Sequence, residues 1–138
     1  MCRQTQISFE DFSQLLKQTG IDQLYYSADS SQYQFLLYLG PKILATAVCR
    51  GTLQFLPAGY QLRIQPDAWR GRTAELDALQ RLNESLRQAL RYPPQFCQAD
   101  DGVWLQSSLA PGARLAYRFS TALLLMLRII REQALPFQ

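Results

Sequence analysis

Side chains that could perform acid–base, nucleophilic or metal chemistry are scarce in this sequence. It contains no histidine, the residue that most often serves as a general base near neutral pH and as a metal ligand. Ser107 and Ser108 lack the G-x-S-x-G context of an activated serine, and no histidine is present to accept the proton. We therefore predict no catalytic residue and no metal ligand, and favour a protein that is not an enzyme.

Asp100 and Asp101 form an adjacent pair of carboxylates immediately before Gly102. An Asp-Gly sequence between two short apolar segments is a strong signal for a β-hairpin turn. Adjacent residues of an extended chain point in opposite directions, so two such acids are poorly placed to act on one substrate. We interpret the pair as the solvated tip of a hairpin in preference to an acid–base or metal site.

The glycines do not form a phosphate-binding loop, because they stand alone in the chain. The segment Trp69-Arg70-Gly71-Arg72 could contact a phosphate, but a loop anchored by its tryptophan before a helix explains the same residues. No cofactor is predicted.

Three cysteines, Cys2, Cys49 and Cys97, are widely separated and form no C-x-x-C spacing. An odd number of distant cysteines predicts free thiols in a reducing compartment. Cys49 and Cys97 lie in apolar, strand-like segments, where a buried thiol behaves as a small hydrophobic side chain.

Length and composition indicate one domain spanning residues 1–138. The chain is 48% hydrophobic and only 18% charged, which is more apolar than an average soluble domain. We expect the surplus to form an interface with another chain. No secretory signal is evident, and the apolar run 122–130 is far shorter than the ~20 residues that cross a bilayer. The expected location is therefore cytoplasmic, without membrane insertion.

Residue patterns in the first half predict one helix followed by strands. Ser8 fits an N-cap, Asp11 follows it with capping-box spacing, and Phe12, Leu15 and Leu16 share one face, which predicts a helix over residues 8–19. The next forty residues are rich in β-branched and aromatic types and predict an antiparallel meander with a break at 50–51. Its expected strands cover residues 24–27, 32–39, 42–49, 52–56 and 60–65.

The second half predicts two helices around a hairpin. A leucine repeat with helical spacing follows Thr73 as the expected N-cap, and Pro93-Pro94 ends that helix after Tyr92. Hairpin strands are expected at 95–98 and 103–108, and a long apolar helix at about 111–133. The predicted fold class is α+β, in the order α-β-β-β(-β)-α-β-β-α, with helices packed on an antiparallel sheet.

Two segments of this second half carry a resemblance to a known family. They are Leu86-Arg87-Gln88-Ala89-Leu90-Arg91-Tyr92-Pro93 and Ala99-Asp100-Asp101-Gly102-Val103-Trp104-Leu105. Together with the order of elements, they resemble the class I type III secretion chaperones of Gram-negative bacteria, and the YscB-type branch in particular. In that family a similar helix ends in a Tyr-Pro pair before a hairpin with an acidic turn.

The resemblance implies a small cytoplasmic dimer, formed by two copies or with a second chaperone. It would hold the extended N-terminal segment of a secreted effector or gatekeeper protein for export, without ATP or another cofactor. The family's dimer contact maps onto Leu79, Leu82, Leu86 and Trp104. Its client-binding grooves map onto Phe12, Leu15, Leu16, Phe35 and Leu37.

Other interpretations remain open. For any single one of these apolar residues, ordinary core is favoured over an interface, since most periodic apolar residues face a sheet. The formal net charge of +3 also permits a small basic nucleic-acid-binding adaptor, although arginines spread along the chain are unlike the concentrated charge of most such proteins. A structural adaptor in a larger assembly is a third possibility. The interpretation as a secretion chaperone expects no nucleic-acid partner.

Overall fold

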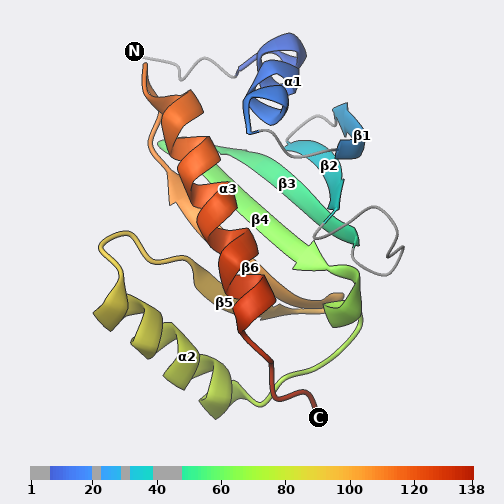
Figure 1. Ribbon diagram of the computed structural model, residues 1–138, viewed down its shortest axis with the longest axis vertical. Helices are drawn as coiled ribbons and strands as arrows, with labels where there is room; N and C mark the ends of the chain where they lie inside the picture. Colours follow the sequence, from blue (N-terminus) through green and yellow to red (C-terminus); the bar gives the residue numbers. More distant parts are fainter. Residues whose placement is uncertain (1–6, 20–22, 29–31, 39–47) are drawn as a thin grey trace.

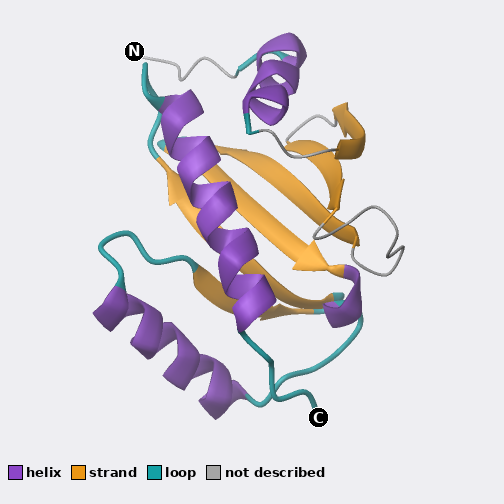
Figure 2. Ribbon diagram, in the orientation of Figure 1, coloured by secondary structure: helices purple, strands orange, loops and turns teal. Residues whose placement is uncertain are grey.

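The structure, a computed structural model, describes residues 7–19, 23–28, 32–38 and 48–138. Within these residues the chain forms three α-helices, one short 3-10 helix and one six-stranded sheet, which confirms the predicted α+β class (Figures 1 and 2). The elements in chain order are α1 (Phe9–Gln18), β1 (Gln23–Ala28), β2 (Gln32–Tyr38), β3 (Val48–Leu56), β4 (Gly59–Pro66), η1 (Asp67–Trp69), α2 (Leu76–Ala89), β5 (Gln95–Ala99), β6 (Gly102–Leu109) and α3 (Leu115–Glu132).

All neighbouring strands of the sheet are antiparallel, and their order is β1-β2-β3-β4-β6-β5. The first four strands form the predicted meander. The β5–β6 hairpin follows α2 and returns so that β6 pairs with β4. As a result β1 and β5, which are distant in sequence, form the two edges of the sheet.

The core lies between one face of the sheet and helix α3, which crosses that face along its length (Figure 1). Phe35 of β2 and Phe119 of α3 are both buried, with ring centroids 6.4 Å apart. Helix α1 closes one end of this core through Phe12, whose ring lies 5.8 Å from Phe35 and 6.3 Å from Phe119. The broad apolar surface of α3 is thus covered by the sheet on one side and by α1 on another.

Helix α1 begins as its sequence predicts. The Ser8 hydroxyl accepts a hydrogen bond from the backbone N–H of Asp11 at 3.1 Å, which satisfies one of the free donors of the first turn. Phe12, Leu15 and Leu16 form its buried face.

Strand β3 corrects the prediction of a break at Arg50-Gly51. The strand continues from Val48 to Leu56, because Gly51 leaves room for the ring of Phe35 on the core side. A Cβ at position 51 would lie 2.3 Å from Cζ of Phe35, so the glycine is a packing site within a strand. Most of the strand expected at 42–49 lies outside the described residues.

The predicted starts of α2 and α3 were also wrong. Thr73 is not an N-cap, because its carbonyl accepts a 2.9 Å hydrogen bond from the N–H of Gln138 and the chain there is extended; α2 starts after Glu75. The helix ends at Ala89, three residues before the expected Tyr92. Helix α3 starts at Leu115, since Gly112 has a φ of 126° that a right-handed helix cannot contain.

In the part of the chain that the structure covers, none of the helices combines the length and apolar character that crossing a bilayer requires.

Candidate functional site on the open face of the sheet

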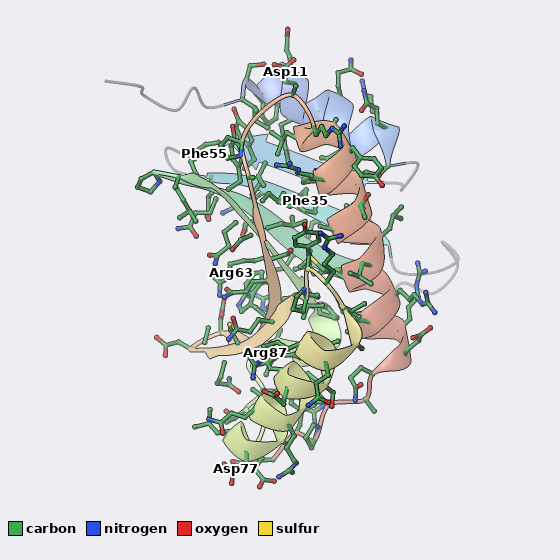
Figure 3. All side chains as sticks on the ribbon, turned by 90° about the vertical axis from the view of Figure 1, so that its left-hand side faces the viewer. Asp11, Phe35, Phe55, Arg63, Asp77 and Arg87 are labelled. Carbon is green, nitrogen blue, oxygen red and sulfur yellow. The ribbon has the colours of Figure 1, made fainter. Side chains whose placement is uncertain are left out.

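The sheet face opposite α3 carries mostly polar side chains. One row runs across five strands, each residue paired in register with the next. Its members are Gln34, Thr52, Arg63, Gln106 and Gln95. In the view turned by 90°, Arg63 lies on the side away from α3 (Figure 3). We refer to this surface as the open face.

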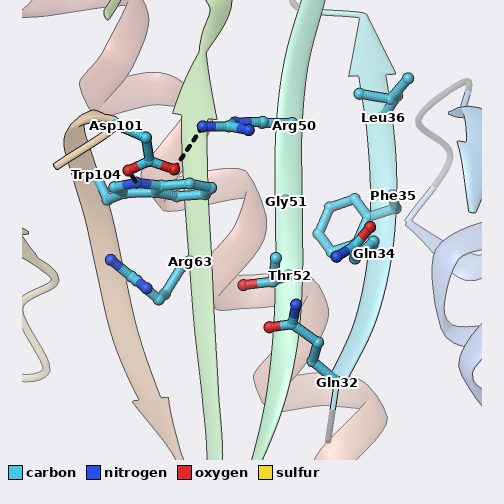
Figure 4. Close-up of a pocket in the computed structure, with 10 residues that line it drawn as sticks. All are labelled: Gln32, Gln34, Phe35, Leu36, Arg50, Gly51, Thr52, Arg63, Asp101 and Trp104. Carbon is cyan, nitrogen blue, oxygen red and sulfur yellow. Dashed lines mark hydrogen bonds and ion pairs between the residues drawn. The ribbon is translucent and has the colours of Figure 1, made fainter. Parts of the chain in front are cut away.

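Trp104 of β6 lies on the open face between two arginines. The guanidinium carbon of Arg50 is 4.7 Å from the indole centroid, and that of Arg63 is 4.8 Å away. Figure 4 shows the indole edge-on, with Arg50 on one side of the ring and Arg63 on the other. Although none of the described helices covers this face of the sheet, Trp104 is only 5% exposed. Such stacked cation–π contacts contribute about 0.5–2 kcal/mol each.

A carboxylate holds the first arginine. Arg50 donates to Asp101 at 2.8 Å, and the indole Nε1 of Trp104 donates to the other oxygen of Asp101 at 2.8 Å. These two contacts fix the carboxylate beside the ring. The pKa of Asp101 lies below its ordinary value, first because of the hydrogen bond from the indole of Trp104. Burial is the next largest effect and opposes this shift, while the charge and hydrogen bond of Arg50 add to it.

Gln65, which is fully buried, ties this arrangement to the backbone. Its side-chain oxygen accepts from Nε of Arg50 at 2.8 Å, and its amide nitrogen donates to the carbonyls of Asp101 and Val103, both at 3.1 Å. Every polar atom of this buried amide group therefore has a partner, which makes the site rigid.

Arg63 differs from Arg50 because it has no carboxylate partner among the described residues. Ion pairs among these residues include Arg50 with Asp101, Arg87 with Glu84 and Arg128 with Glu132. Nε of Arg63 is buried and has no hydrogen-bond partner within the same residues. Arg63 lines a hollow of about 400 Å³ whose walls also include Gln34, Thr52, Arg50 and Trp104. The hollow is thus lined by two guanidinium groups, Arg50 and Arg63, and by one carboxylate, Asp101.

The five residues mapped to client binding lie in the core. Phe12, Leu15, Leu16, Phe35 and Leu37 are each at most 8% exposed. Their burial agrees with the alternative that the sequence left open, ordinary core packing.

The residues mapped to a dimer contact do not form one surface. Leu79 lies on the buried face of α2. Leu82 and Leu86 of the same helix are half-buried and pack against the core. Trp104 belongs to the open face instead. The structure therefore separates Trp104 from the three leucines.

The thiols and the acidic turn are placed as expected. Cys49 is buried, Cys97 is half-buried, and both are free; burial raises the pKa of Cys49 to about 12. Cys2 lies outside the described residues. Asp100 and Asp101 do sit at the tip of the β5–β6 hairpin, but Asp101 also contacts Arg50 and Trp104.

Sequence reasoning missed Arg50, Arg63 and Gln65 as parts of one site. The available signal was alternation: each occupies a polar position between buried neighbours on β3 or β4. Misreading Arg50-Gly51 as a break concealed that signal on β3.

Potential metal ligands do not gather in groups of three or more anywhere in the described ranges. Compared with known family models, curated proteins and solved structures, the chain matches none of them.

Proposed function

We propose that this protein is a cytoplasmic type III secretion chaperone that binds the extended N-terminal segment of a secreted effector or gatekeeper protein. The bound segment would add as a strand to the sheet at β1, and the chaperone would act as a homodimer or as a heterodimer with a second chaperone. The observation that carries the proposal is the difference between the two edges of the sheet.

The β5 edge is closed by a side chain. Asn83 of α2 accepts a hydrogen bond from the N–H of Phe96 at 2.7 Å and donates to the carbonyl of Phe96 at 3.1 Å. Its amide thus takes the place that a neighbouring strand's peptide group would occupy. Asn83 is itself buried, which prevents another chain from pairing at this point.

The β1 edge has no such cap among the described residues. Strand β1 pairs with β2 on one side, and the strand order leaves its other side without a paired strand. A strand edge without a paired neighbour can accept an extended peptide through main-chain hydrogen bonds, with little dependence on sequence. This mode of binding suits a chaperone that keeps its client unfolded. Ordering the client costs several kcal/mol, so additional side-chain contacts are required.

The test combines co-purification with a proline scan of β1. The protein is purified from its native cells, the bound secreted protein is identified, and its N-terminal segment is produced as a labelled peptide. Proline is then placed in turn at residues 25–28. Alternate residues of an edge strand direct their N–H outward, so proline at those positions is expected to weaken binding while the fold is retained.

Ala110→Pro, in the exposed loop after β6, is the matched control and should bind the peptide normally. Undiminished binding by every folded β1 variant would contradict strand addition. If no segment of a secreted protein binds, while labelled RNA or DNA binds at low salt, the chaperone proposal is wrong and the nucleic-acid-binding adaptor is favoured.

A further inference from the structure

We infer that Arg63, together with Thr52 and Gln34, forms a binding site on the open face for the carboxylate of an Asp or Glu side chain in a bound polypeptide. This inference rests on the proposed function only in taking the partner to be a polypeptide. It adds a specificity element: the partner segment carries an acidic residue that docks beside Trp104.

The first argument is the asymmetry around the indole. Arg50 and Arg63 stack on opposite sides of Trp104 at nearly equal distances, 4.7 and 4.8 Å. On the Arg50 side, Asp101 supplies a carboxylate that accepts from the guanidinium at 2.8 Å. On the Arg63 side no described residue supplies one, although the hollow leaves room for it (Figure 4). The protein's own Asp101 therefore illustrates which chemical group completes such an arrangement.

The second argument is the unsatisfied donor. Nε of Arg63 is buried without a hydrogen-bond partner among the described residues. A buried donor of a charged group is costly to leave unpaired, and a carboxylate is the acceptor that matches guanidinium geometry best. A carboxylate in the hollow would pair with the part of the guanidinium group that lines it and would neutralise part of the net charge of +3.

The third argument concerns the neighbours of Arg63. Thr52 is its register partner on β3, and Gln34 is the register partner of Thr52 on β2. Both line the hollow and bring a hydroxyl and an amide, which can donate to a second carboxylate oxygen. The site therefore offers donors of three kinds in one row of the sheet.

The fourth argument favours a polypeptide over nucleic acid. Proteins that bind single-stranded nucleic acid stack bases on exposed aromatic rings. Both faces of Trp104 are already covered by arginines, and the residue is only 5% exposed. The ring thus orients the guanidinium groups and is not available for base stacking.

The first test selects binders from a displayed library of random 12-residue peptides on the purified protein. We expect enrichment of Asp or Glu at one position with the wild-type protein. That enrichment should be lost with Arg63→Gln and kept with Arg118→Gln, which removes the same charge from the exposed side of α3. An acid preference that persists in Arg63→Gln, or that never arises, would overturn the inference.

The affinity of a selected peptide is then compared with that of its Glu→Gln counterpart by fluorescence anisotropy. A charge-assisted pair of this kind corresponds to a ratio of about 10- to 100-fold on the wild-type protein. The ratio should fall to about one on Arg63→Gln. Arg63→Lys keeps the positive charge and the aliphatic stem, so it should retain part of the affinity ratio. A retained ratio also shows that substitution at position 63 does not unfold the protein. Equal ratios in all variants would contradict the site.

The second test needs no peptide and separates this inference from the proposed function. Acetate and inorganic phosphate are titrated separately while NMR follows the side-chain Nε–H of Arg63. A saturable shift with acetate that is stronger than that with phosphate supports a carboxylate site, even if no secreted client is found. Absence of a shift, or a preference for phosphate accompanied by oligonucleotide binding that Arg63→Gln abolishes, would overturn it and leave strand addition at β1 unaffected.

Discussion

Gly51 shows how a single residue sets the packing of two strands. The ring of Phe35 occupies the space in which a Cβ at position 51 would lie, 2.3 Å from its Cζ atom. Phe35 also contacts the rings of Phe12 and Phe119, so it cannot move without disturbing the core.

We therefore expect Gly51→Ala to lower the free energy of unfolding by about 1–3 kcal/mol, the usual cost of overpacking. Urea denaturation measures this change. Phe35→Leu provides the control, because a smaller side chain relieves the clash: adding Gly51→Ala to Phe35→Leu should cost clearly less than adding it to the wild type. Equal costs in the two backgrounds would refute the clash.

Asp101 gives the site a pH dependence. Its pKa in the folded protein is lowered, first by the indole hydrogen bond and then by Arg50. The stabilisation is thus complete above the pKa of Asp101 in the unfolded chain, and it is lost as the pH falls through the lower, folded value. Because the side chain is 52% exposed, we expect a modest effect.

Thermal unfolding between about pH 2 and 7 should therefore show a steeper acid-side loss of stability in the wild type than in Asp101→Asn. Asp100→Asn, at the neighbouring exposed position of the same turn, is the matched control and should follow the wild-type profile. Identical profiles for wild type and Asp101→Asn would contradict this assignment.

At the scale of elements, helix α2 protects an edge strand. It packs beside β5, and Asn83 satisfies both the N–H and the carbonyl of Phe96 on the outer side of that strand (Figure 1). Without the amide, these two backbone groups would be buried and unpaired.

Asn83→Ala is expected to destabilise the protein by about 2 kcal/mol, since leaving a buried polar group unsatisfied costs 1–3 kcal/mol. It should also promote association through the uncapped β5 edge, measurable as increased light scattering. Ser85→Ala, at an exposed position of the same helix, should do neither. If Asn83→Ala and Ser85→Ala had the same urea midpoint, the capping role would be excluded.

At the scale of the whole molecule, the four most exposed large apolar side chains among the described residues lie at two separate places. On the α2 side these are Leu76 and Tyr92, 65% and 77% exposed; on the outer side of α3 they are Tyr117 and Leu124, 71% and 48% exposed. Leu76 and Tyr92 flank the half-buried Leu82 and Leu86, which were mapped to a dimer contact. We therefore place the proposed dimer contact along α2.

Sedimentation equilibrium tests this placement. The double variant Leu76→Lys with Tyr92→Lys should weaken the dimer about tenfold or more, because apolar anchors at an interface commonly contribute over 1 kcal/mol each. The double variant Tyr117→Lys with Leu124→Lys adds the same charge on α3 and should leave association unchanged. A stronger effect of the α3 variant would move the contact to that helix.

The sequence by itself determined that three helices form and in which order, the strand-rich half and the acidic turn, because those depend on residues a few positions apart; the exact ends of α2 and α3 it did not determine. Ser8 with Asp11 marks the start of α1, and Asp101-Gly102 marks the β5–β6 hairpin. The same local patterns established the α+β class.

Only the tertiary structure decided where distant segments meet. Contact with the C-terminal residues keeps Thr73 out of α2, and the ring of Phe35 allows β3 to pass through Gly51. Arg50 and Asp101 are 51 residues apart, yet they meet beside Trp104. Their meeting depends on the register of β3, β4 and β6, which the whole sheet fixes at once, whereas sequence patterns report only on neighbours along the chain.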